Sequence, residues 1–153
     1  MAKKTIALLG AGSWGTAIAI HLAQIGHKVL LWGHKPQHVA RMRKDKANHH
    51  YLPNISFPPS LMPVEDLEQC IQQADEVLIA VPSQAFATLL KQFTSKPQGL
   101  AWLTKGIDPL SHRLLHQLVA ERFGDSFPVA VISGPSFAKE VAQFLPTALT
   151  LAG

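Results

Sequence analysis

A glycine-rich turn between an apolar run and a helix-like segment constrains the fold of this chain more than any other feature. Gly10, Gly12 and Gly15 have the spacing G-x-G-x-x-G, directly after the apolar run at residues 5–9 and at the start of an apolar-periodic segment at 14–25. The run predicts a strand buried on both faces, and the periodic segment predicts a helix. In such a turn the first glycine makes the bend, the second lets the backbone approach a pyrophosphate, and the third lets helix and strand pack closely.

The start of the predicted helix supplies the groups that would hold this anion. Backbone N–H groups of Ser13 and Trp14 lie at the helix N-terminus, where the helix dipole favours negative charge. A lone match to this spacing is weak evidence, and a tight turn without a ligand is the alternative. The strand before it and the helix after it favour a dinucleotide-binding turn.

Strand-like and helix-like segments alternate along the rest of the chain. Further strands are expected at 28–32, 75–81, 100–104, 129–132 and 148–151, and further helices at 36–46, 66–74, 83–93, 111–123 and in a short stretch from residue 137. Because right-handed crossovers have to cover the sheet, this alternation predicts an α/β domain of the Rossmann type, a doubly wound, mainly parallel sheet with helices on both faces. Residues 48–63 contain four prolines and are expected to form an ordered loop that could hold a short strand.

Length and composition are those of one domain with its own core. The 153 residues are 47% hydrophobic, which is enough for one core, so we expect one dinucleotide-binding domain over 1–153. No apolar run approaches the ~20 residues that cross a bilayer, so we expect no membrane insertion. The net charge is +4, and the basic residues are scattered along the chain except for the run from Arg41 to Lys46, which is expected to be a solvated helix end. This scatter disfavours a nucleic-acid partner, because binding a nucleic-acid backbone needs many aligned cations. The single cysteine, Cys70, excludes an intramolecular disulfide, fits a reducing, cytoplasmic compartment and is expected to be a packed thiol.

Residues just after the other strands are candidates for substrate binding, because ligands of such sheets bind beyond the carboxyl ends of the strands. Lys105 follows one strand, where a cation can hold a substrate phosphate or polarise a developing alkoxide; a surface lysine is the alternative. Gly134 and Ser136 follow the next strand, where free N–H groups could hold a second anion; a plain Ser N-cap is the alternative. Pro82 fixes the turn after an earlier strand, and Ser83 is the expected N-cap of the helix there.

The end of the second strand is where an acidic residue would bind the ribose hydroxyls of NAD. Here the sequence is Gly33-His34-Lys35, without a carboxylate. Because nearby cations could meet a 2′-phosphate, the expected cofactor is NADP or NAD, with NADP at least tolerated. His34 is expected to contact the cofactor, the alternative being an exposed side chain.

The histidines do not predict a metal site. His49 and His50 are adjacent in sequence, so they are not spaced to share one helical face. His112 and His116 have i, i+4 spacing on the helix predicted there, but no third ligand is evident. A G-x-S-x-G motif is absent as well, so neither a metal centre nor Ser/His/Asp hydrolysis is expected.

Several short motifs, taken in order, resemble those of bacterial NAD(P)-dependent glycerol-3-phosphate dehydrogenases. They are Gly10-Ala-Gly-Ser-Trp-Gly-Thr-Ala-Ile-Ala19, Asn48 to Pro53 with Tyr51-Leu52-Pro53, Val81-Pro82-Ser83, Thr104-Lys105-Gly106-Ile107 and Ser133-Gly134-Pro135-Ser136-Phe137-Ala138. Such a series covers essentially the whole chain and is more specific than the glycine-rich turn alone.

The resemblance implies reversible hydride transfer between NAD(P)H and dihydroxyacetone phosphate, giving sn-glycerol 3-phosphate for phospholipid synthesis. It implies that the dinucleotide contacts Ser13, Trp14, His34, Lys105 and Ala138, and that the small phosphate substrate contacts Lys105, Gly134 and Ser136.

Members of this family carry a second, largely helical domain that supplies the proton-transferring lysine, and this sequence stops before it. We therefore expect a chain cut from a longer enzyme that is a possible homodimer, with no catalytic residue in this chain and with dinucleotide binding but not normal turnover. The alternatives are another two-domain dehydrogenase of the 6-phosphogluconate or 3-hydroxyacyl type, and a non-catalytic module that senses the dinucleotide.

Overall fold

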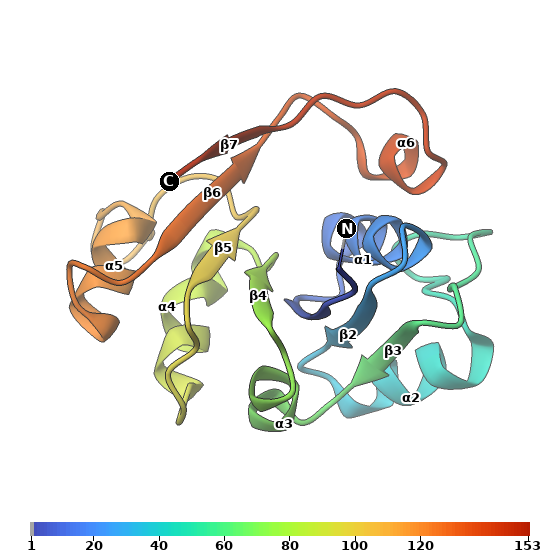
Figure 1. Ribbon diagram of the computed structural model, residues 1–153, viewed down its shortest axis with the longest axis horizontal. Coiled ribbons are helices and arrows are strands. Elements are labelled where there is room, and N and C mark those ends of the chain that lie inside the picture. Colours follow the sequence, from blue (N-terminus) through green and yellow to red (C-terminus); the bar gives the residue numbers. More distant parts are fainter. Residues whose placement is uncertain (1) are drawn as a thin grey trace.

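A seven-stranded sheet organises the structure, a computed structural model that describes residues 2–153 (Figure 1). The strands are β1 (Thr5–Leu9), β2 (Lys28–Trp32), β3 (Leu61–Val64), β4 (Glu76–Ile79), β5 (Leu100–Trp102), β6 (Val129–Ser133) and β7 (Thr150–Ala152). Their order across the sheet is β3-β2-β1-β4-β5-β6-β7, and β1 to β6 are parallel while β7 is antiparallel to β6. The predicted doubly wound, mainly parallel fold is confirmed, and the order of the strands reverses at β1 and β4.

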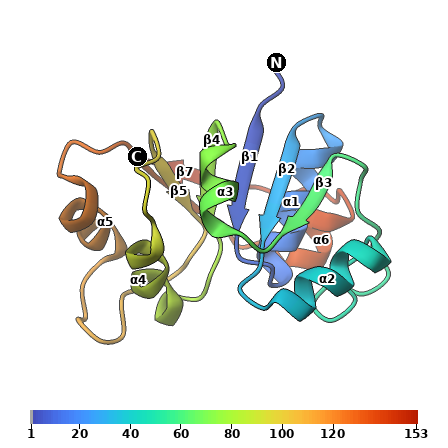
Figure 2. The same cartoon turned by 90° about the horizontal axis from the view of Figure 1, so that it is seen from below.

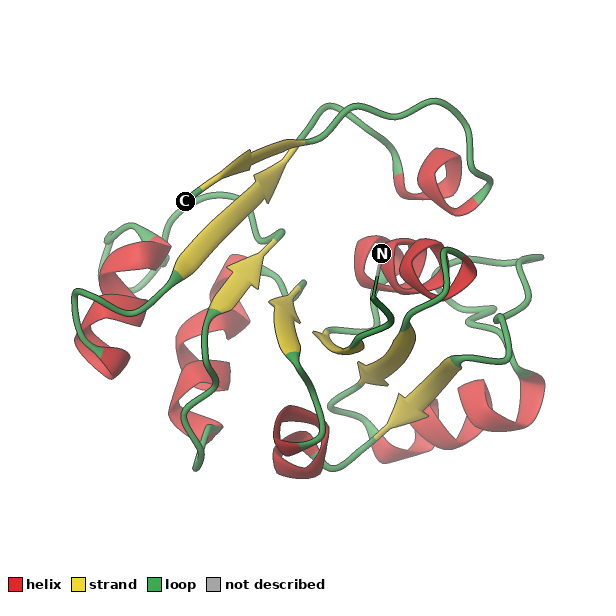
Figure 3. Cartoon of the chain, in the orientation of Figure 1, coloured by secondary structure: helices red, strands yellow, loops and turns green. Residues whose placement is uncertain are grey.

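Helices cover both faces of the sheet (Figure 3). They are α1 (Ser13–Gln24), α2 (Pro36–Asp45), α3 (Leu67–Gln72), α4 (Ser83–Gln92), α5 (Leu115–Phe123) and α6 (Ala138–Ala142). Side chains alternate across a strand, so Leu8 and Leu31 pack with α1, α2 and α6, whereas Leu9 and Leu30 pack with α3, α4 and α5. Figures 1 and 2 both place α6 beside α1, although more than a hundred residues separate them in sequence.

Helix α5 begins at Leu115 rather than at residue 111, so the predicted helix 111–123 was too long at its start. Asp108 accepts hydrogen bonds from the Ser111 hydroxyl at 2.6 Å and the Ser111 N–H at 2.7 Å, which folds the preceding residues into a turn. The same bonds hold the pKa of Asp108 below its usual value. His112 has a left-handed φ of 59° in this turn. The predicted helix that would have carried both His112 and His116 is therefore wrong at His112, and the two histidines do not share a helical face.

Smaller differences concern the other predicted boundaries. Helix α4 begins at Ser83 and has Pro82 as its N-cap, with no side-chain cap, so the predicted Ser83 cap is wrong. The loop at 48–63 ends in the strand β3, which starts at Leu61. The last strand is at Thr150–Ala152 instead of 148–151.

Cys70 lies on α3 and is completely buried against the sheet, as the apolar periodicity predicts. Burial raises the pKa of its thiol to about 12, so almost no thiolate is present at neutral pH. We expect a disulfide reagent at pH 8 to leave the folded protein unmodified and to react about 100-fold faster or more in denaturant. Absorbance of the released thiol measures both rates, and rapid stoichiometric labelling of the folded protein would contradict the burial.

Candidate functional site

A cavity of about 480 Å³ opens at the carboxyl ends of β1, β2, β4 and β5, at the reversal of strand order. Its walls come from the glycine-rich turn, the β2–α2 junction, Tyr51, and the residues that follow β4 and β5. This is the position in which doubly wound sheets bind ligands. Of the residues predicted from strand ends, His34, Pro82 and Lys105 therefore lie together in one hollow with the glycine-rich turn.

The three glycines of the turn have three different surroundings. A Cβ on Gly10, which has a φ of +125°, would lie 2.8 Å from the carbonyl carbon of Ala80 on the neighbouring strand's end. A Cβ on Gly15 would lie 1.9 Å from the Gly10 carbonyl oxygen. A Cβ on Gly12 would meet nothing within 4 Å, and Gly12 lines the cavity. The first and third glycines thus permit close packing, while the second leaves open space beside the turn.

The N-terminus of α1 faces the same cavity through Ser13 and Trp14. Gly12 is its N-cap, no side chain caps it, and its first turn contains no acidic residue. Because N–H groups in the first turn of a helix have no partner within the helix, this end favours an anion. The Ser13 hydroxyl donates to the Tyr51 carbonyl oxygen at 2.9 Å, which holds the loop after α2 beside the turn.

The β2–α2 junction contributes His34, Lys35 and His38 to the cavity wall. None of the residues that line this cavity is acidic. An anionic group would therefore meet nearby cationic and imidazole side chains without a repelling carboxylate. Sequence reasoning identified His34 but missed His38 and Tyr51; one helical turn separates His38 from His34, which is the signal that could have found it.

Lys105 lies at the far end of the cavity from His34 and has an exposed side chain. Its Nζ donates to the Gly134 carbonyl oxygen at 3.3 Å and lies 6.0 Å from the centroid of the Trp14 ring. Thr104 donates from its hydroxyl to the Val81 carbonyl oxygen at 2.7 Å, which joins the ends of β4 and β5 beneath the lysine. The fold thus brings Lys105, Trp14 and Gly134 together from three separate segments.

Gly134, Ser136 and Ala138 follow β6, as predicted, but only Gly134 borders the Lys105 region, in a small hollow shared with Trp14. The Ser136 hydroxyl donates to the Ala148 carbonyl oxygen at 3.4 Å, and Ala138 packs against the α1 core, so neither lines the large cavity. The Phe137 N–H donates to the Glu140 carboxylate at 3.4 Å. The N–H groups expected to be free at this junction are therefore partly occupied.

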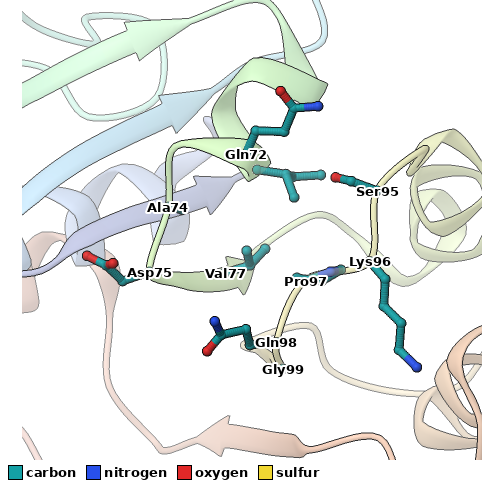
Figure 4. A pocket seen from close by; sticks show the side chains of 10 residues that line it. Gln72, Ala74, Asp75, Val77, Ser95, Lys96, Pro97, Gln98 and Gly99 are labelled. Carbon is teal, nitrogen blue, oxygen red and sulfur yellow. The ribbon is translucent and has the colours of Figure 1, made fainter.

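A second, smaller cleft of about 200 Å³ lies at the amino ends of β4 and β5 (Figure 4). It is lined by residues between Ile71 and Val77 and between Ser95 and Gly99. Figure 4 shows Lys96 extending away from Gln72 and Asp75, and its Nζ donates to the Phe123 carbonyl oxygen at 3.0 Å. The cleft lies at the end of the sheet opposite the glycine-rich turn.

No cluster of three or more His, Cys, Asp and Glu side chains within residues 2–153 is placed to hold a metal ion. Within the same part of the chain, no helix has the length and apolar character needed to cross a membrane.

Residues 5–153 match the family described as NAD-dependent glycerol-3-phosphate dehydrogenase N-terminus. A Legionella pneumophila (strain Paris) protein named glycerol-3-phosphate dehydrogenase [NAD(P)+] is 68% identical over 99% of this chain and 46% of its own length. Its counterpart in Thioalkalivibrio sulfidiphilus is 50% identical over the same shares of both chains. The crystal structure of glycerol-3-phosphate dehydrogenase from Coxiella burnetii has a TM-score of 0.89 and 46% identity, over 97% of this chain and 46% of that chain. The chain spans about half the length of the curated relatives it matches.

Proposed function

The chain belongs to the NAD-dependent glycerol-3-phosphate dehydrogenase family, and from that premise we propose that it is the dinucleotide-binding half of an NAD(P)-dependent sn-glycerol-3-phosphate dehydrogenase. The proposed reaction reduces dihydroxyacetone phosphate to sn-glycerol 3-phosphate in the cytoplasm, for phospholipid synthesis. One observation carries the proposal: an uncapped helix N-terminus and an unobstructed glycine face one cavity without acidic lining residues.

The cavity fits a dinucleotide laid along the carboxyl edge of the sheet. Its adenosine end would lie against His34 and Lys35, and its pyrophosphate against the N–H groups of Ser13 and Trp14. Its nicotinamide end would reach toward Pro82 and Lys105. Open space at Gly12 supports this fit, because a bridging phosphate requires close approach to the backbone there.

When bound, the reduced nicotinamide supplies a hydride to the substrate carbonyl. Lys105 is the cation at that end of the cavity, so it binds the substrate's negatively charged or carbonyl oxygens and stabilises charge as it develops. Its contact with the Gly134 carbonyl oxygen supports a role for Gly134 beside the same substrate. The proton that completes the alcohol comes from a lysine in the second half of the enzyme, as the family resemblance implies.

The proposal is tested by titrating the protein with NADPH and NADH while following tryptophan fluorescence, because Trp14 is one of three tryptophans and lines the cavity. We expect saturable quenching with one site per chain, and no normal turnover of dihydroxyacetone phosphate by this half alone. Failure to bind either nucleotide would overturn the proposal. In the longer enzyme, equal rates with 6-phosphogluconate or a 3-hydroxyacyl substrate would favour the rival dehydrogenases, whereas nucleotide binding without any turnover would favour a sensing module.

The absence of a carboxylate at the β2–α2 junction leads to a prediction about cofactor choice. We expect Lys35→Glu to weaken NADPH binding by about tenfold or more and NADH binding much less, because the new carboxylate repels a 2′-phosphate. Lys44→Glu makes the same charge change in the last turn of α2, away from the cavity, and serves as the control. Equal losses for both nucleotides, or an equal effect at Lys44, would place the 2′-phosphate elsewhere.

A further inference from the structure

Asn48 is buried behind the cavity without lining it, with only 1% of its surface exposed. Its Nδ2 donates to the Ala11 carbonyl oxygen at 2.9 Å and to the Thr16 hydroxyl oxygen at 2.8 Å. Its Oδ1 lies 3.0 Å from Nε2 of His38. Every hydrogen-bonding group of this side-chain amide therefore has a partner, and each partner belongs to a different turn or helix.

The directions of these bonds follow from the donors available. Because both Nδ2 protons are used, Oδ1 can only accept, so His38 carries a proton on Nε2 and donates it. This bond fixes the imidazole at the cavity wall, where its ring centroid lies 5.6 Å from that of Tyr51. His38 is thus held in one orientation at the adenosine end of the proposed site.

The partners of Asn48 connect the middle of the cavity to one of its ends. Ala11 belongs to the glycine-rich turn, and Thr16, which is fully buried, lies one turn into α1. His38 lies in the first turn of α2, at the end of the cavity that also holds His34. The Asn48 carbonyl oxygen also accepts from the Leu52 N–H at 2.8 Å, which curls the loop that carries Tyr51 back over the site. A single buried amide therefore ties the pyrophosphate-binding turn to the helix that borders the adenosine.

We propose that Asn48 is a positioning residue for the dinucleotide, which sets the spacing between the glycine-rich turn and His38 so that the pyrophosphate and the adenosine of one ligand fit at once. The inference rests on the proposed function. A dinucleotide joins its pyrophosphate and its adenosine covalently, so it gains affinity only if the protein holds both subsites at the matching separation. A fragment that occupies one subsite has no such requirement.

The test compares NADPH with two partial probes, adenosine and inorganic pyrophosphate, by fluorescence and NMR titration. In Asn48→Asp the side chain keeps its shape but cannot donate, so its carboxylate faces the Ala11 carbonyl oxygen. We expect NADPH binding to weaken about tenfold to a hundredfold in Asn48→Asp and in His38→Ala, and each partial probe to change less than about threefold in Asn48→Asp. In His38→Ala only pyrophosphate binding is expected to stay within about threefold, because His38 lines the cavity at the adenosine end. His38→Gln keeps a side-chain N–H and is expected to bind NADPH at least about threefold more tightly than His38→Ala.

Ser60→Ala is the matched control, because the Ser60 hydroxyl donates to the Ala23 carbonyl oxygen at 3.1 Å, at the opposite end of α1. It is expected to leave NADPH affinity unchanged. If the unaltered protein does not bind NADPH, the proposed function fails and this inference fails with it. If the unaltered protein binds NADPH and Asn48→Asp binds it equally well, only this inference is overturned. Equal weakening of all three ligands in Asn48→Asp also overturns it, since that marks a general structural role. If Asn48→Asp does not fold, the comparison of His38→Gln with His38→Ala decides, and equal NADPH affinities of these two variants overturn the inference.

Discussion

Gly15→Ala is expected to lower the free energy of unfolding by about 3 kcal/mol or more, a large share of the 5–15 kcal/mol typical of a domain. The new Cβ would lie 1.9 Å from the Gly10 carbonyl oxygen and 3.0 Å from Leu8 Cδ2. The obstacle is backbone rather than the end of a flexible side chain, so α1 has to move away from β1. That movement would open the core that Ala17 and Ile20 form against the sheet. Denaturant unfolding followed by circular dichroism measures the loss.

Gly12→Ala is the matched control, since it adds the same methyl group three residues earlier in the same turn. Its φ of −81° is ordinary for alanine, and the added Cβ meets nothing within 4 Å. We expect the unfolding free energy to stay within about 0.5 kcal/mol of the unaltered protein, while NADPH binding weakens about tenfold or more because the methyl group occupies the space proposed for the pyrophosphate. A stable Gly15→Ala protein, or a Gly12→Ala protein with full affinity, would contradict the separate roles given to the two glycines.

Lys105→Met in the complete enzyme is expected to lower kcat/KM for dihydroxyacetone phosphate by about 100-fold or more. Methionine retains an apolar stem but removes the charged side chain that the described residues 2–153 contribute to the proposed nicotinamide end of the cavity. Folding should change little, by about 0.5 kcal/mol or less, because the Lys105 side chain is exposed and makes a single hydrogen bond of 3.3 Å.

Steady-state kinetics with varied substrate, together with NADPH titration, separate substrate effects from cofactor effects. Lys91→Met is the control, because Lys91 is an exposed lysine in the last turn of α4 and does not line the cavity. We expect Lys91→Met to behave as the unaltered enzyme. A kcat/KM for Lys105→Met within threefold of normal would remove Lys105 from the proposed substrate site.

Local patterns predicted most elements because the forces that form them act over a few residues. The apolar runs of β1 and β2 were predicted with the bounds that the structure has. The start of α5 was not, since the side chain of Asp108 captures Ser111 and competes with helix formation. The direction of β7 was also beyond sequence reasoning, because it depends on how the chain returns from α6 to pair with β6.

The residues of the candidate site also divide into those that local sequence patterns predicted and those that they did not. Gly10, Gly12, Ser13, Trp14 and Lys105 were found from spacing and strand ends, and all line the cavity. Neither Ser136, which was predicted from a strand end, nor Ala138, whose role rests on the family resemblance alone, lines it. His38 was missed although it lies four residues after His34. Asn48 and Tyr51 stand in a motif of the family resemblance, but an asparagine and a tyrosine in a proline-rich loop give no local sign of lying beside a ligand site.

By itself, the sequence determined the turn that would hold an anion, since three glycines at fixed spacing meet steric demands within one strand, turn and helix. Only the tertiary structure decided which side chains from distant segments surround that turn. Asn48 is hydrogen-bonded to Ala11, which lies 37 residues before it, and to His38, which lies 10 residues before it. Lys105 is hydrogen-bonded to Gly134, which lies 29 residues after it. Such contacts depend on how the crossover helices pack on the sheet. The packing of the whole core determines that arrangement, so no local sequence pattern predicts it.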